Sequence, residues 1–201
     1  MSRPYILAET PWKTVRSTEY SVAVLPWGAT EAHNYHLPYG TDVMECDAVA
    51  AEAARLAWSA GARVMVLPTV PFGVNTGQLD IDFCLNMNPS TQAALLGDLG
   101  SALEGQGIRK LVVLNGHGGN DFRQMIRELQ PKTSVFLCTL NWYTSVDPST
   151  YFDEPGDHAG ELETSVMQHI APELVLPLSE AGDWSQKHPS IVALRERWVW
   201  A

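Results

Sequence analysis

Paired cysteines, long apolar runs and clusters of basic side chains are all missing from this sequence. The three cysteines lie far apart and form no CxxC pair, so neither a disulfide framework nor a thiolate zinc site is expected. No apolar run approaches the roughly 20 residues that a membrane-spanning helix needs. The N-terminal stretch MSRPYILAETPW also lacks the apolar centre of a signal peptide. We therefore expect a cytoplasmic protein that does not associate with membranes.

Positive charge is scarce as well. The chain has 13 Lys and Arg residues against 23 Asp and Glu residues, which gives a formal net charge of −10. Such a chain repels polyphosphate, and no stripe of basic side chains could neutralise a nucleic-acid backbone. Nucleic acid is therefore not an expected partner, and a small-molecule substrate is. A length of 201 residues fits one domain, spanning 1–201, that can bury a core without disulfides.

Short apolar runs alternate with helical patterns along the chain. The apolar runs predict buried strands at 21–25, 63–67, 110–114 and 134–140. The helical patterns, with Gly or Pro at their ends, cover 43–60, 90–106, 121–130 and 161–170. This alternation predicts an α/β fold with a mostly parallel central sheet covered by helices on both faces.

Polar, glycine-bearing stretches follow each predicted strand. They read GATEAH, PTVPFGVNTGQ, NGHGGN and NWYT in chain order. In a parallel sheet, the loops beyond the carboxyl ends of the strands lie at one edge, where ligands bind. The sequence therefore predicts one active site at this edge.

The first and third of these stretches carry candidate metal ligands. Glu31 and His33 are two residues apart, so their side chains share one face of an extended segment. Asp42 follows a Gly-Thr turn that can return a second carboxylate to the same place, although it could instead cap the helix that begins near residue 43. His117 stands among glycines that allow close approach of the backbone. The same glycines could also form an anion-binding nest.

The stretch DHAGELETS, which leads into the last predicted helix, adds further candidates. Both Glu161 and Glu163 could be acids that the helix dipole favours in a first turn. Helical spacing turns them to different sides, and we expect Glu161, the nearer to His158, to enter the site. The full candidate set is Glu31, His33, Asp42, His117 and Glu161. These ligands suit Zn²⁺, Mn²⁺ or Fe²⁺, and they suffice for two ions that share a carboxylate and hold a hydroxide for hydrolysis.

The motifs LPWGATEAH, LPYGTD, VLNGHGGN and DHAGELETS, in this order, resemble those of the creatininase (creatinine amidohydrolase) family. The resemblance implies a three-layer α/β/α fold, two divalent metal ions, hydrolysis of C–N bonds in cyclic or linear amides, and a homo-oligomer, often a hexamer. It also implies one ion held by Glu31, Asp42 and His117, and a second held by His33, Asp42 and one more glutamate. Creatininase itself carries that glutamate where this chain has Gly119, so we expect Glu161 to replace it and creatinine not to be inherited as the substrate. The family pattern also continues beyond Ala201.

The expected mechanism uses two further residues. A metal-bridging hydroxide would attack the amide carbonyl, His158 would pass a proton to the leaving nitrogen, and Trp142 would form a wall of the pocket. His158 could instead only brace a ligand. The same ligand set would also serve an isomerase, a lyase or a hydrolase that acts on a keto-sugar or keto-inositol. It would equally serve a metal-binding oligomer without catalysis.

Substrate contacts are expected from Asn75, Thr76 and Gln78, unless their segment is a solvated loop. Trp184, Trp198 and Trp200 predict either a packed C-terminal strap or a subunit interface.

Overall fold

The structure is a computed structural model that describes residues 3–156 and 158–182. The predictions for Trp184, Trp198 and Trp200 lie outside the described residues, as does the C-terminal part of the expected single domain. None of the described helices is long and apolar enough to cross a membrane.

A parallel four-stranded sheet forms the centre of the molecule, with strand order β2-β1-β3-β4. Its strands are β1 (Val22–Trp27), β2 (Val64–Val66), β3 (Lys110–Asn115) and β4 (Phe136–Asn141). All four predicted strands are present, and the predicted α/β class with a parallel sheet is confirmed.

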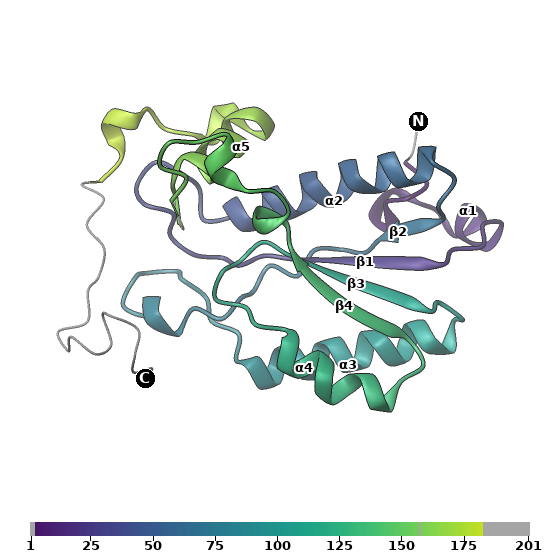
Figure 1. The fold of residues 1–201 in the computed structure, drawn as a ribbon. Helices are drawn as coiled ribbons and strands as arrows, with labels where there is room; N and C mark the ends of the chain where they lie inside the picture. The colour runs from purple at the N-terminus through teal and green to yellow at the C-terminus, as the bar shows by residue number, and fades with distance from the viewer. Residues whose placement is uncertain (1–2, 157, 183–201) are drawn as a thin grey trace.

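Helices cover both faces of this sheet (Figure 1). One face carries α2 (Thr41–Ser59), with α5 (Glu161–Ile170) packed against it. The other face carries α3 (Pro89–Gly105) and α4 (Arg123–Leu129). The short α1 (Trp12–Arg16) was not predicted from the sequence. The described 3₁₀ helices are Leu7–Glu9, Thr76–Gln78, Gln130–Lys132, Trp142–Thr144, Pro148–Thr150, Pro172–Leu174 and Leu178–Glu180.

Alternation along β1 explains why this strand reads as a continuous apolar run. Ala23, Leu25 and Trp27 belong to the core cluster that also contains buried residues of α3 and α4. Val22 and Val24 pack with the cluster formed by α2 and β2 on the opposite face. Successive side chains of a strand point to opposite faces, so a strand between two helical layers is apolar on both.

The carboxyl ends of the strands lie together at one edge of the sheet. Trp27, the last residue of β1, pairs with Asn115 of β3, and Asn115 pairs with Asn141 of β4. The loops that follow these strands therefore start side by side, and α2 begins at the same edge. This alignment places the candidate ligands.

Candidate metal centre

Four of the five predicted ligands meet in the loops at this edge. Glu31 and His33 come from the loop after β1, Asp42 from the first turn of α2, and His117 from the loop after β3. Their exposed fractions are 1%, 0%, 1% and 7%. Ionisable side chains are so deeply buried only where they pair with one another or bind a metal.

Gly28 allows the loop after β1 to pass directly over the start of α2. A Cβ atom added there would lie 2.8 Å from the carbonyl carbon of Asp42 and 2.8 Å from the backbone nitrogen of Val43. No side chain fits into that space, so any other residue would push the loop away from the helix. The glycine thus keeps Glu31 and His33 within reach of Asp42.

The first ligand group consists of Glu31, Asp42 and His117. The Nδ1 atom of His117 lies 2.8 Å from Oε1 of Glu31 and 3.1 Å from Oδ2 of Asp42. The other ring nitrogen, Nε2, lies 3.0 Å from the carbonyl oxygen of Val74, to which its N–H donates. That bond leaves the lone pair of Nδ1 for a cation, the arrangement common in metal-binding histidines.

The second ligand group consists of His33, Asp42 and Glu163. Nε2 of His33 lies 2.9 Å from Oδ1 of Asp42 and 3.9 Å from Oε1 of Glu163. Its Nδ1–H donates to the carbonyl oxygen of Glu31 at 3.2 Å, which leaves Nε2 facing the two carboxylates. Asp42 therefore offers one oxygen to each group, the geometry of a carboxylate shared between two cations.

Asp42 does not cap α2. The residue before the helix is Gly40, and Asp42 lies inside the first turn without a side-chain capping bond there. Both of its oxygens face the histidines instead. The capping alternative drawn from the sequence is therefore wrong.

The structure corrects the expectation that Glu161 enters the site. Glu161 is exposed, and its Oε2 accepts a hydrogen bond from the backbone N–H of Glu154 at 3.0 Å. Glu163 faces the histidine instead, because Met167, one turn further along α5, is fully buried and sets the inward face of the helix. The apolar residues at 167 and 170, four and seven positions after 163, lie on this face, but Leu162 and Val166 are apolar too, so the sequence leaves the rotation of the helix open.

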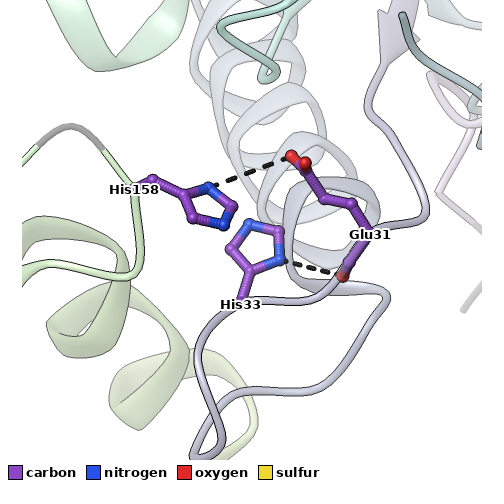
Figure 2. A group of neighbouring side chains, drawn as sticks. All are labelled: Glu31, His33 and His158. Carbon is purple, nitrogen blue, oxygen red and sulfur yellow. Dashed lines mark hydrogen bonds and ion pairs between the residues drawn. The ribbon is translucent and has the colours of Figure 1, made fainter. Parts of the chain in front are cut away.

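His158 stands beside Glu31 and His33, as Figure 2 shows, and these three side chains form a further group that could hold a cation. Its Nε2–H donates to the carbonyl oxygen of Ala32 at 2.8 Å, and its Nδ1 lies 3.9 Å from Oε1 of Glu31. The ring packs on that of His33 with centroids 4.4 Å apart. The side chain is 38% exposed, so His158 joins the buried cluster to solvent.

Two aromatic residues follow β4 next to the site. Trp142 packs on the apolar cluster between β2 and α2, and its Nε1 lies 3.1 Å from the position a Cβ would take on Gly116. Its role as a pocket wall stays a prediction. Tyr143, which no sequence motif singled out, has a pKa that is raised by burial and by the charges of Asp42 and Glu163. The ionisation of its hydroxyl group therefore depends on the charges of the same cluster.

Two other buried polar residues serve the scaffold. Asn75 is buried, and its amide donates to the carbonyl oxygen of Leu85 at 3.0 Å, so it holds a loop together and is not open to a substrate. His36 is buried as well, and its Nε2 lies 3.0 Å from Oγ1 of Thr164 on α5. Thr76 is exposed, and Gln78 contacts Glu31.

The charges of the cluster shift one another's pKa values strongly. Burial lowers the pKa of His33, but the hydrogen bond and charge of Asp42, with Glu163 and Glu31, outweigh it and raise the value to about 9. His117 is raised to about 10 against the same burial effect by Asp42 and Glu31. Burial raises the pKa of Asp42, yet the two histidines hold it at about 2. Without a cation, protons on the histidines balance the carboxylates.

A divalent cation should therefore displace protons when it binds. Both histidine pKa values lie above 7.5, so at that pH both rings are protonated without metal, and each must lose a proton to bind an ion. We expect release of about two protons per chain, and affinity for Zn²⁺ that rises with pH up to about 10. Calorimetric titration at pH 7.5 in buffers of different ionisation enthalpy measures the protons released. Binding without proton release would contradict the assignment of these rings as ligands.

The donor set fits divalent transition-metal ions. Two imidazoles that each turn one ring nitrogen towards carboxylates, three carboxylates and no thiolate meet within one cluster of described residues, and Zn²⁺, Mn²⁺ and Fe²⁺ prefer such ligands. Of the three candidate groups among the described residues, two share the Asp42 carboxylate, and the third joins Glu31 and His33 to His158.

Comparison with known proteins found a matching family model and similar solved structures. The family model Creatininase, described as creatinine amidohydrolase, matches residues 8–201. A structure from Bacteroides fragilis, described as a candidate creatinine amidohydrolase, is 48% identical with a TM-score of 0.91, and the match covers 100% of this chain and 81% of the other. A creatininase variant described as the Zn-Zn type is 26% identical with a TM-score of 0.75, over 94% of this chain and 81% of the other.

A curated relative from Mycobacterium ulcerans is a mycofactocin precursor peptide peptidase. It is 30% identical over an alignment of 166 residues, and the match covers 76% of this chain and 60% of the relative. The chain thus spans about 60% of the length of such relatives.

Proposed function

Because the chain belongs to the creatininase family, we propose that it is an amidohydrolase that depends on two divalent metal ions and cleaves a C–N bond of a small cyclic or linear amide. The observation that carries this proposal is the division of the Asp42 carboxylate, with one oxygen facing His33 and the other facing His117. One ion would be held by Glu31, Asp42 and His117, and the other by His33, Asp42 and Glu163.

Bound ions supply the Lewis acidity and the activation of water that amide hydrolysis needs at neutral pH. The protein's own residues orient the ligand side chains and protonate the leaving nitrogen. The carbonyl oxygens of Glu31 and Val74 fix which nitrogen of His33 and of His117 would face a bound ion. His158 is anchored through Nε2, so its Nδ1 can deliver a proton to a leaving nitrogen at the solvent side. Trp142 would bound the pocket beside it.

An amide is the functional group that the relatives' names have in common. One relative is a peptide peptidase and others are creatinine amidohydrolases, and both names describe cleavage of C–N bonds. We infer an amide substrate for this chain, and Zn²⁺, Mn²⁺ or Fe²⁺ as its ions. We also propose that the protein acts in the cytoplasm as one domain within a homo-oligomer.

Incorporation of oxygen from water tests the reaction class. Protein loaded with Zn²⁺ or Mn²⁺ is incubated in H₂¹⁸O with cyclic amides, formamides and short peptides. The molecular masses of the products are then measured by mass spectrometry. We expect one ¹⁸O atom in the new carboxyl group, because the carbonyl carbon takes its new oxygen from solvent. Chelation should abolish the reaction, and either metal should restore it.

The isomerase alternative gives a different result. Its product would have the mass of the substrate without a new carboxyl group, so a keto-sugar converted in this way would overturn the proposal. Turnover that persists after complete removal of metal would overturn it as well.

A further inference from the structure

The loop between residues 73 and 86 is a braced unit that lies against Glu31. A backbone bridge between Gly73 and Asn86 closes the loop, and the side-chain oxygen of Asn86 accepts the backbone N–H of Asn75 at 2.8 Å. The backbone N–H of Leu85 donates to Thr30, next to Glu31, at 3.0 Å. The loop is therefore fixed both to itself and to the segment that carries two candidate ligands.

The side chain of Gln78 extends from this loop to the carboxylate of Glu31, a candidate metal ligand. Its Nε2–H donates to Oε2 of Glu31, and its Oε1 accepts from the thiol of Cys84 at 3.5 Å. The sulfur of Cys84 in turn accepts the backbone N–H of Ala32 at 3.2 Å. A continuous chain of hydrogen bonds thus runs from the backbone beside Glu31, through Cys84 and Gln78, back to the Glu31 carboxylate.

These hydrogen bonds give the two carboxylate oxygens of Glu31 different partners. Oε2 is taken by Gln78, while Oε1 lies 2.8 Å from Nδ1 of His117, in the first ligand group. The hydrogen bond from Gln78 occupies one lone pair of Oε2 and holds the carboxylate with Oε1 turned towards the first ligand group. We propose that Gln78 is a positioning residue that makes Glu31 a ligand through one oxygen.

The burial of Glu31 makes the hydrogen bond from Gln78 important for the orientation of the carboxylate. Glu31 is 1% exposed, so water cannot readily replace a lost donor, and a buried charged acceptor without its partner is costly. Without Gln78 the carboxylate would turn to offer both oxygens to the ion. The inference rests on the proposed metal-dependent function, because only a bound ion makes the orientation of Glu31 matter.

Replacement of Gln78 by methionine tests the role. Methionine keeps the length of the side chain but cannot donate to Glu31. We expect an affinity for Zn²⁺, measured by competition with a chelator, that falls by about 10- to 100-fold, as for other groups that orient a metal ligand. In the Co²⁺-loaded protein the visible absorption should shift and weaken, since a second oxygen raises the coordination number. Gln124→Met, the same chemical change at an exposed position of α4, should leave both readouts unchanged.

The outcomes separate this inference from the proposed function. Unchanged affinity and an unchanged Co²⁺ spectrum in Gln78→Met would overturn the role of Gln78 alone. Metal binding that responds to Gln78→Met, in a protein that hydrolyses no amide, would support the positioning role and leave only the reaction class wrong. A wild-type protein that binds no metal would overturn both.

Cys84 offers a second, independent variant. Cys84→Ala removes the donor to Oε1 of Gln78 and should reproduce the Co²⁺ shift in part, because the amide loses one of its two anchors. Cys84→Ser keeps a donor and an acceptor and should restore the wild-type spectrum. Wild-type spectra for both variants would show that the thiol does not hold Gln78.

Discussion

Asp42→Asn is expected to lose metal from both ligand groups at once. Asp42 gives Oδ1 to His33 and Oδ2 to His117, so its amide analogue removes the negative charge from both groups and turns an N–H donor towards one histidine. Hydrolysis should fall by well over about 100-fold, beyond the range for side chains that only support a ligand. Metal content per chain, measured by mass spectrometry, should drop from about two to below one.

An aspartate outside the site provides the matched control. Asp98 is exposed on α3, and Asp98→Asn makes the same chemical change far from the histidines. It should keep wild-type metal content and activity. If Asp42→Asn kept two ions, Asp42 would not be the shared ligand. If it lost one ion only, its two oxygens would serve the same cation.

The fold and most of the cluster could be predicted because local sequence determines them. The apolar runs of β1 and β3 are buried on both faces, so short strands of this kind were recognisable without tertiary information. The positions of Glu31, His33 and His117 follow from the rule that loops after parallel strands meet at one edge. Asp42 joined them because α2 starts at the same edge.

The choice between Glu161 and Glu163 could not be made from these local rules. Both residues lie in the first turn of α5, and which one faces inward depends on how the helix is rotated about its axis. The burial of Met167 against neighbouring elements sets that rotation, and Ala159, with φ of 50°, sets the path of the chain into the helix. The contact between Gln78 and Glu31 could not be predicted from the sequence either, because it depends on how a loop of 14 residues closes on itself.

Glu163→Gln and Glu161→Gln should give opposite results in the metal assay. Glu163 faces His33 across 3.9 Å, whereas Glu161 is exposed and bonds to the backbone of Glu154. Glu163→Gln should reduce metal content from about two ions per chain to about one, and hydrolysis by more than about 100-fold. Glu161→Gln should retain two ions and near wild-type activity.

The reverse pattern would require a different helix orientation. Residues two apart on an α-helix point about 160° away from each other, so Glu161 could reach His33 only if α5 turned through most of half a circle. That rotation would bring Met167, fully buried in the structure, out to solvent, at a cost of about 2 kcal/mol or more. Loss of one ion in Glu161→Gln but not in Glu163→Gln would therefore contradict the packing of α5 on α2, and not only the assignment of a ligand.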